Sequence, residues 1–477
     1  MSNSLSFNNI KKPWIHLLKG RKKPPFSPLI RNLLRLPNRP GAYLQSTDTD
    51  VLLIEQPIGF KVQNDMHALQ IKDELALWLI TEEAVPLQFD DEPGRTYFAV
   101  VQNTLEDFEK IVDLRKGTIQ FLCLDPYGYG NERTFIKAAG TEETNIVVLN
   151  NPGTVKSYPN FKFTVKKNIT HLDILSDEAH MRIGMPATIE DTVISPTDVI
   201  LSDSMNTLVG WANASQVDGG IVAGSFMTGS EGFQVDSFGS GEAWHGPSLQ
   251  KSISQPLKDF QVEMRCKFFS MNHAGVGRIE LYLLDANGTR FAKLAFKDIH
   301  RYNYLQQGEA RVGPHIGGTF IIAGSPPNPK QWDYFTGILR LSRRNGKWEA
   351  YIANIDGVHI GVMEATRIDE SVNADLAGIQ IHAGVSGTNS PATMRIQQIR
   401  VLKLNDVSGS KIPFIAKPGD EISIDHKAKS IRINGEDKIK LKDFGSSYFP
   451  IKRGDTALMV IPGDAVDIEA KVRGVYH

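Results

Sequence analysis

Hydrophobic and polar residues alternate along the segment 117–124, which predicts a β-strand because successive strand side chains point to opposite faces. One face is wholly apolar and consists of Ile119, Phe121 and Cys123. The other face becomes apolar towards its end, at Leu122 and Leu124, so we expect the end of the strand to be covered on both sides. Asp125-Pro126 then ends the strand, since proline has no N–H for the ladder.

A spacing of three and four residues predicts a helix before this strand. Its apolar positions are Ala68, Ile71, Leu75 and Trp78. They fall on one face of a 3.6-residue period, and Asn64 or Asp65 can cap the start. Trp78 lies on that face, so we interpret it as a core residue rather than a binding residue. A similar spacing recurs at Leu105, Phe108, Ile111 and Leu114.

Beyond residue 137 the patterns predict strands only. Strand patterns occupy 144–149, 161–165 and 169–175, and a similar texture resumes in 421–425, 430–434, 456–461 and 466–472. Neither half alone has enough strands for a stable sandwich, so we expect one β-sandwich formed by 138–195 and 406–477. The intervening 196–405 contains enough strand patterns for a two-sheet jelly roll. A sandwich whose first and last strands pair has adjacent ends and can be inserted into another domain.

The length of 477 residues predicts about three domains, and the 41% hydrophobic and 22% charged content is ordinary for a globular chain. The patterns together predict a mainly β fold, with an α+β domain over 1–137. The two cysteines, Cys123 and Cys266, lie in apolar strand patterns, so we expect buried thiols and synthesis in a reducing compartment. We expect no metal, no cofactor, no membrane span and no export by the usual route.

Residues 1–40 carry nine Lys or Arg and no Asp or Glu. Prolines interrupt their short apolar runs, which predicts extended arms and edge strands rather than a helix. The charge fits a solvated or partner-facing arm, and the alternative is a nucleic-acid contact. We favour the arm because no recognition helix accompanies the charge. The acidic run Asp90-Asp91-Glu92 is interpreted as a solvated turn, with a cation site as the alternative.

The N-terminal part resembles the distal tail proteins of siphophages over nearly all of residues 5–135. The matching stretches are Leu18-Lys19-Gly20-Arg21, Asn32-Leu33-Leu34, Arg39-Pro40-Gly41-Ala42-Tyr43-Leu44, Ala76-Leu77-Trp78-Leu79, Phe89-Asp90-Asp91-Glu92-Pro93 and Asp125-Pro126-Tyr127. The resemblance implies that 1–137 is a ring-forming (belt) domain, six copies of which close under the tail tube. It also implies a galectin-like fold for the split sandwich, where Gly153-Thr154 to Pro159 matches the family. The insert resembles the concanavalin-type, carbohydrate-binding-module-like insertions of "evolved" members.

The function that this resemblance implies is structural rather than enzymatic. The protein is expected to be the hub that joins the tail tube to the baseplate or tail tip of a long, non-contractile tail, after synthesis in the host cytoplasm. The implied partners are other copies of the chain, the major tail tube protein, a tail-associated lysin or fibre protein, a receptor-binding protein and host cell-wall polysaccharide. No membrane and no specific nucleic acid is expected.

Sugar binding needs aromatic faces for the C–H side of the ring, with amides and carboxylates for its hydroxyls. The candidates in the insert are Trp244, His245, Tyr302, Tyr304 and Trp332. We interpret Trp211 and Trp348 as core residues because they stand in apolar, strand-like contexts.

An enzyme that degrades glycans on the insert is the alternative function. We find no convincing pair of carboxylates of the glycosidase kind within one strand, and no G-x-S-x-G, H-E-x-x-H or P-loop motif. We therefore expect no catalytic residue.

Overall fold

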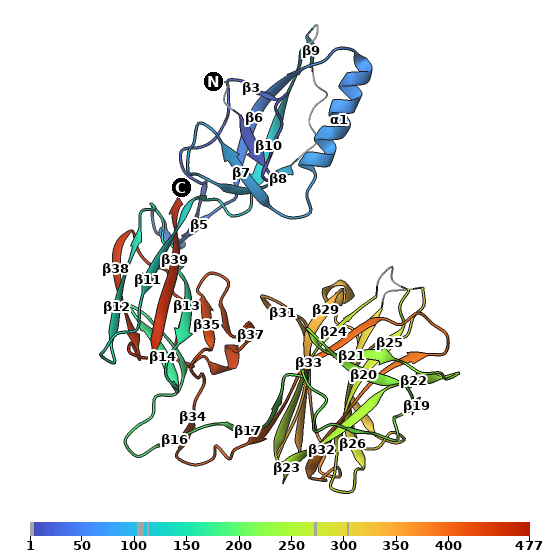
Figure 1. The fold of residues 1–477 in the computed structure, drawn as a ribbon. Coiled ribbons are helices and arrows are strands. Elements are labelled where there is room, and N and C mark those ends of the chain that lie inside the picture. Colours follow the sequence, from blue (N-terminus) through green and yellow to red (C-terminus); the bar gives the residue numbers. More distant parts are fainter. Residues whose placement is uncertain (1–3, 103–108, 112–113, 271–273, 303–304) are drawn as a thin grey trace. The chain divides into compact units, whose positions relative to one another are not determined.

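In the computed structural model, strands dominate the chain, which confirms the mainly β prediction (Figure 1). The structure describes residues 4–102, 109–111, 114–270, 274–302 and 305–477. By their internal contacts the residues fall into two units. The first unit comprises 1–184, 418–431 and 439–477, and the second comprises 185–417 and 432–438.

The N-terminal part of the first unit is built on one sheet with the strand order β2-β1-β7-β8-β10-β6-β3, to which β9 adds at β10. Its strands are β1 (Leu5–Phe7), β2 (Ile10–Lys11), β3 (His16–Leu17), β6 (Leu52–Lys61), β7 (Val85–Phe89), β8 (Tyr97–Gln102), β9 (Glu109–Ile111) and β10 (Leu114–Cys123). Strand β10 pairs with β6 over its whole length, from Leu114 opposite Lys61 to Cys123 opposite Leu52.

Strand β10 presents its predicted apolar face to the core, where Ile119, Phe121 and Cys123 are fully buried. The expectation that its end is covered on both sides is wrong, because Leu124 lies beyond the strand and is exposed. The apolar residue at that position therefore belongs to the exit of the strand and not to a second buried face.

The predicted helix forms as α1 (Asp65–Leu79), and it packs against this sheet. Ala68, Ile71, Leu75 and Trp78 are all buried. The Asn64 side chain caps the helix by accepting a hydrogen bond from the His67 N–H at 2.8 Å. The Trp78 indole donates to the Phe7 carbonyl at 2.9 Å, which confirms Trp78 as a core residue.

The second helical spacing does not produce a helix where the structure describes it. Residues 109–111 form strand β9, which pairs antiparallel with β10. Leu105 and Phe108 lie outside the described residues. Pairing with an existing strand edge outweighs a helical spacing as short as this one.

The first unit also contains a two-sheet sandwich whose strands come from both ends of the chain. One sheet contains β11-β39-β13-β35 in this order, and the other has the order β12-β38-β14-β15. The bounds are β11 (Gly128–Lys137), β12 (Asn145–Asn151), β13 (Asn160–Val165), β14 (His171–Leu175), β15 (His180–Gly184), β35 (Glu421–Asp425), β38 (Gly454–Ile461) and β39 (Val466–Tyr476). Strand β39 lies between β11 and β13, so segments some three hundred residues apart share one sheet. Strands β36 (Ser430–Ile433) and β37 (Glu436–Asp437) follow β35 and pair antiparallel.

The second unit is a larger sandwich (Figure 1). One sheet has the order β20-β21-β33-β24-β29-β30-β31 with β17 added at β33, and the other has the order β18-β23-β32-β25-β26-β27-β28 with β22 added at β32 and β19 at β22. The bounds in the first sheet are β17 (Thr197–Asp203), β20 (Ser225–Gly229), β21 (Gly232–Ser237), β24 (Phe260–Phe269), β29 (Phe335–Arg344), β30 (Lys347–Asp356), β31 (Val358–Ile368) and β33 (Thr393–Leu404). In the second sheet they are β18 (Ala212–Asn213), β19 (Gly220–Val222), β22 (Trp244–Gly246), β23 (Ser248–Leu257), β25 (Gly277–Leu284), β26 (Arg290–Asp298), β27 (Gln306–Val312), β28 (Thr319–Gly324) and β32 (Leu376–Ser386).

The first long strand of this sandwich, β17, pairs antiparallel with its last, β33, and Thr197 lies opposite Leu404. The two ends of the sandwich are therefore adjacent. Outside it, β16 (Thr192–Ile194) pairs in parallel with β34 (Lys411–Pro413). Both cysteines are buried and free, as predicted.

Candidate functional site

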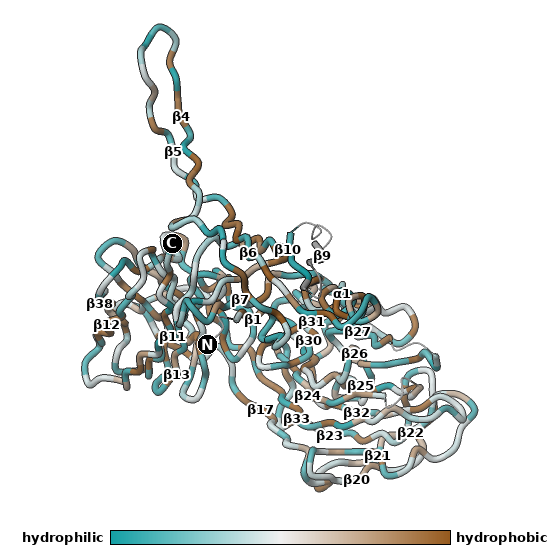
Figure 2. The backbone as a smooth tube through the Cα atoms, turned by 90° about the horizontal axis from the view of Figure 1, so that it is seen from above, coloured by the Kyte–Doolittle hydropathy of each residue, from teal (hydrophilic) through white to brown (hydrophobic). Residues whose placement is uncertain are grey.

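A hairpin in the N-terminal part consists of β4 (Leu29–Leu34) and β5 (Tyr43–Thr49), and every residue of β4 is exposed. Figure 2 shows it standing clear of the rest of its unit, with apolar stretches along both strands. Its exposed apolar residues are Leu29, Ile30, Leu33, Leu34, Tyr43 and Leu44. A lone two-stranded hairpin is marginally stable in water, and a contiguous exposed apolar patch marks an interaction surface. The hairpin is thus a candidate protein-contact element.

Several of the positive charges of the first forty residues are paired with carboxylates within the fold. Arg21 lies 3.0 Å from Asp91 and 3.2 Å from Glu92, and Lys23 lies 2.6 Å from Glu92. Lys11 pairs with Asp90 at 2.6 Å. The acidic run forms the predicted turn and is mostly exposed, and its carboxylates also serve as ion-pair partners for the basic segment.

Of the predicted sugar-binding residues, Trp244 lies in β22, opposite Ser386 of β32, and is half-buried. The Arg278 guanidinium lies 4.8 Å from the centre of its ring, a cation–π contact. His245 is buried, and its Nδ1 lies 2.9 Å from the Ala243 carbonyl oxygen. A glycan on the surface therefore reaches Trp244 more readily than His245.

The other candidate sugar-binding residues differ widely in solvent exposure. Tyr302 is 85% exposed, and Tyr304 lies outside the described residues. Trp332 is 0% exposed, its ring packs against Phe296 and Phe335, and its indole donates to the Gly361 carbonyl at 2.8 Å. The expectation that Trp332 contacts a sugar is wrong, because a fully buried ring offers no face to a ligand on the surface.

The sequence did not indicate a charged sheet face that the structure builds in the same unit. On the outer side of β25, Glu280 is buried and lies 3.3 Å from the Arg278 Nε and 3.1 Å from the Lys293 Nζ. Burial alone would raise the pKa of Glu280, but the two cations outweigh it and hold that pKa at about 2. Burial lowers the pKa of His382, on the neighbouring β32, to about 4 despite the opposing charge of Glu280.

A chain segment covers part of this face. Within it, Asp218 is buried and pairs with Arg311 at 2.7 Å and with Arg290 at 3.0 Å. Val217 packs on the ring of Tyr282. The period-2 spacing of Arg278, Glu280 and Tyr282 was the one sign of this face in the sequence, and their burial depends on a segment some sixty residues away.

Among the described residues, no group of three or more His, Cys, Asp or Glu side chains is placed to hold a metal ion. In the same part of the chain, no helix is long and apolar enough to cross a membrane.

Comparison with known families identifies two domains. The phage tail protein RIFT-related domain matches residues 9–123, and the siphovirus-type tail component C-terminal domain matches residues 387–476. No curated protein sequence matches the chain.

Three solved structures are similar at low identity. The Dit protein of phage SPP1 is 16% identical, with 39% of this chain and 75% of that chain covered and a TM-score of 0.34. The CBM2 module of the evolved Dit of Lactobacillus casei BL23 phage J-1 is 16% identical, with 45% of this chain and 100% of that chain covered and a TM-score of 0.40. SCLam, a non-specific endo-β-1,3(4)-glucanase of family GH16, is 7% identical, with 50% of this chain and 97% of that chain covered and a TM-score of 0.33.

Proposed function

The chain belongs to the distal tail protein family of siphophages, and on this premise we propose that it is the hub that joins the tail tube to the baseplate or tail tip. The observation that carries the proposal is the pair of tail-component domains, one at each end of the chain. The expected partners are the tail tube protein above the hub, and a tail-associated lysin or fibre protein and a receptor-binding protein below it.

The hub is proposed to be a ring of six copies, closed through the β4–β5 hairpin. The support is physical, since a hairpin that exposes Leu33 and Leu44 to water gains stability when a neighbouring copy covers it. The ion pairs of the basic segment disfavour the alternative nucleic-acid function, because Arg21 and Lys23 are already paired with carboxylates.

Native mass spectrometry of the purified protein, alone and with tail tube protein, tests the ring. Six copies are expected, as single or stacked rings. A monomer at micromolar concentration that stays a monomer in the presence of tail tube protein contradicts the proposal.

We further propose that the sandwich in 196–405, inserted into the domain made by 138–195 and 406–477, binds host cell-wall polysaccharide. Trp244 offers part of an aromatic face beside Arg278, and Tyr302 adds an exposed ring. Six weak sites on one ring add through avidity, so a shallow site is sufficient. Replacing Trp244 by Ala is expected to reduce binding of the ring to host cells while the ring itself stays intact.

A glycan-degrading enzyme is the less favoured alternative. A general acid must carry a proton near neutral pH, whereas the pKa of Glu280 lies at about 2 and that of Glu309 is also lowered, by Lys293 and Lys297, against the effect of burial. Incubation with wall polysaccharide should therefore release no reducing ends. Release that disappears in the Glu280→Gln variant would establish the enzyme instead.

A further inference from the structure

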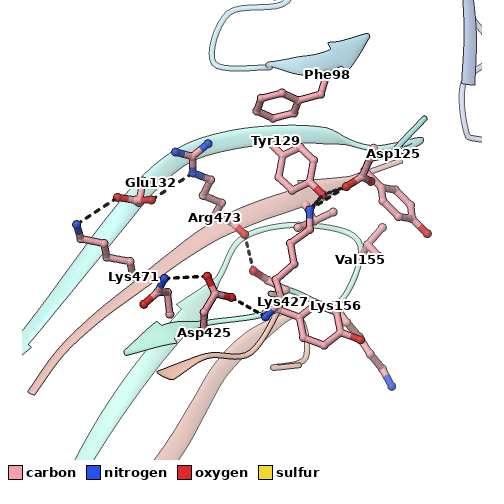
Figure 3. A pocket seen from close by; sticks show the side chains of 15 residues that line it. Phe98, Asp125, Tyr129, Glu132, Val155, Lys156, Asp425, Lys427, Lys471 and Arg473 are labelled. Atoms are coloured by element: carbon pink, nitrogen blue, oxygen red, sulfur yellow. Dashed lines mark hydrogen bonds and ion pairs between the residues drawn. The ribbon is translucent and has the colours of Figure 1, made fainter. Parts of the chain in front are cut away.

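A cleft of about 610 Å³ lies in the first unit, where the exit of β10 meets the sandwich (Figure 3). Its wall combines residues of β8, β11, β13, β39 and the turn after β35. The volume is within the range of about 300–1,000 Å³ that is typical of small-molecule sites. None of the described residues of 196–405 lines it.

One wall of the cleft is held by several contacts around Tyr129. The Tyr129 hydroxyl donates to Asp125 at 2.5 Å, and the Lys427 ammonium lies 2.8 Å from the same carboxylate. Lys427 also lies 4.5 Å from the centre of the Tyr129 ring, and Phe98 meets that ring edge-on at 5.7 Å. Figure 3 shows Phe98, Tyr129 and Lys427 in succession along this wall. These contacts orient the Tyr129 ring and the Lys427 ammonium along the wall.

The opposite side is loosely paired. Glu132 of β11 lies 3.3 Å from the Arg473 Nε and 3.8 Å from the Lys471 Nζ of β39, and all three side chains are about half exposed. Such pairs contribute only about 0–1 kcal/mol, so exchanging them for ligand contacts costs little. A carboxylate and a guanidinium side by side present both acceptors and donors to a ligand.

Tyr158 and Asn160 complete the cleft. Tyr158 is 46% exposed, so its ring is open to a ligand. The Asn160 amide donates to Asp425 at 3.0 Å, which orients the side chain and directs its carbonyl oxygen away from that carboxylate. The site thus offers an aromatic surface next to an oriented amide.

A β-bulge shapes the cleft. The register of β11 against β39 shifts between Tyr129 and Glu132, because three residue steps on β11 span only two on β39. A bulge of this kind bends a strand and re-aims its side chains. Here the bulge places Tyr129 on the first wall and Glu132 on the opposite side of the cleft.

We propose that this cleft is a binding site for a neutral oligosaccharide, separate from any site on the insert. The lining holds three acidic residues (Asp125, Glu132 and Asp425) and four basic ones (Lys156, Lys427, Lys471 and Arg473), so the charges nearly balance. A strongly charged ligand would meet lining charges of its own sign as well as of the opposite sign, whereas sugar hydroxyls use donors and acceptors together. The C–H face of a sugar ring packs on Tyr158.

The test is isothermal titration calorimetry of the full-length protein with a set of neutral tetrasaccharides of glucose, galactose and N-acetylglucosamine. We expect at least one of them to bind. Tyr158→Ala and Asn160→Ala should each weaken its Kd about 5-fold or more, which is the size of one lost aromatic or hydrogen-bonding contact. Thermal unfolding verifies that both variants are folded.

Two matched controls separate this site from others. Phe444→Ala removes a fully exposed aromatic residue from the same unit outside the cleft, and Trp244→Ala removes the candidate on the insert. Both should leave the Kd within about two-fold of the unmodified protein. The proposal is overturned if no tetrasaccharide binds, or if binding is unchanged in the Tyr158 and Asn160 variants. Loss of ring or tail assembly in these two variants, without saccharide binding, would assign the cleft to a protein contact instead.

Discussion

Individual aromatic residues of this chain differ in role in a way that their neighbours in sequence do not reveal. Trp332 follows a Pro- and Gly-rich loop and still fills the core, because its ring packs between strands of both sheets. Tyr302 comes from an equally polar segment and is exposed. Burial is decided by which strands surround a residue, and for Trp332 one of them, β26 with Phe296, is remote in sequence.

Trp332→Ala is therefore expected to destabilise the insert by about 3–5 kcal/mol, the cost of deleting a large buried ring. Tyr302→Ala, its exposed counterpart, should change stability by no more than about 0.5 kcal/mol. Differential scanning calorimetry of both variants measures this. Equal midpoints in the two variants would show that Trp332 is not a core residue.

The buried His382 makes a pH-dependent contribution to the free energy of unfolding. Its pKa is lowered to about 4 in the folded protein, against about 6.5 in an unfolded chain, so the unfolded state binds a proton first as the pH falls. The contribution of His382 to the free energy of unfolding is fully present above pH 6.5. It decreases by about 3 kcal/mol as the pH falls to 4 and is constant below that. Glu280 acts in a lower window, between pH 4.5 and 2, because its pKa is held at about 2.

The His382→Asn variant should retain the hydrogen bond to the Pro247 carbonyl and lose this titration. Urea unfolding at pH 7, 6, 5 and 4.5 should therefore show a shallower loss of stability in the variant. His426, whose pKa burial also lowers to about 4, leaves a residual slope in both proteins. Identical slopes in the two proteins would show that His382 is not the titrating group.

At the scale of elements, the apolar side chains of the β4–β5 hairpin are left exposed by the fold of their own chain. Leu33 and Leu44 lie opposite each other in the ladder and are both exposed. A partner that covers them removes apolar surface from water, which stabilises an assembly by about 25 cal/mol per Å². If the hairpin is the ring contact, as proposed, its apolar side chains leave water on assembly and not on folding.

The double variant Leu33→Ser, Leu44→Ser should therefore leave the monomer folded, with a stability change of about 1 kcal/mol or less, and prevent ring formation. Phe444→Ser, which removes an exposed apolar residue outside the hairpin, serves as the control and should assemble normally. Size-exclusion chromatography with light scattering gives the readout. Intact rings in the double variant would exclude the hairpin as the ring contact.

At the scale of the whole molecule, the proposed insertion of 196–405 predicts that this sandwich can be removed. Thr197 and Leu404 are paired across the ladder, so the chain enters and leaves the sandwich at one point. Paired strand residues have Cα atoms about 4.5–5.5 Å apart, a gap that a short linker spans. This geometry makes the borders at 195 and 405 testable.

Replacing residues 198–404 by a Gly/Ser linker of about four residues should leave a folded, ring-forming protein without cell-wall binding through the insert. Circular dichroism and native mass spectrometry check the fold and the ring. An insoluble product at every linker length would show that the borders are misplaced or that the two parts fold together.

The sequence by itself determined features that depend on local patterns. The period of 3.6 between Ala68 and Trp78 defined α1, and the period of 2 between Ile119 and Cys123 defined the buried face of β10. The resemblance in residues 5–135 agrees with the domain found at 9–123. These predictions succeed because helix and strand faces are set by residues only a few positions apart.

Only the tertiary structure decided which distant segments meet. It placed β39 between β11 and β13, paired Arg21 with Asp91, and buried Glu280 beside Lys293. The cleft lined by Tyr158 and Asn160 likewise combines residues from distant parts of the chain. Sheet pairing, charge compensation and cavity shape depend on contacts between segments tens to hundreds of residues apart, for which a local hydrophobic pattern carries no signal.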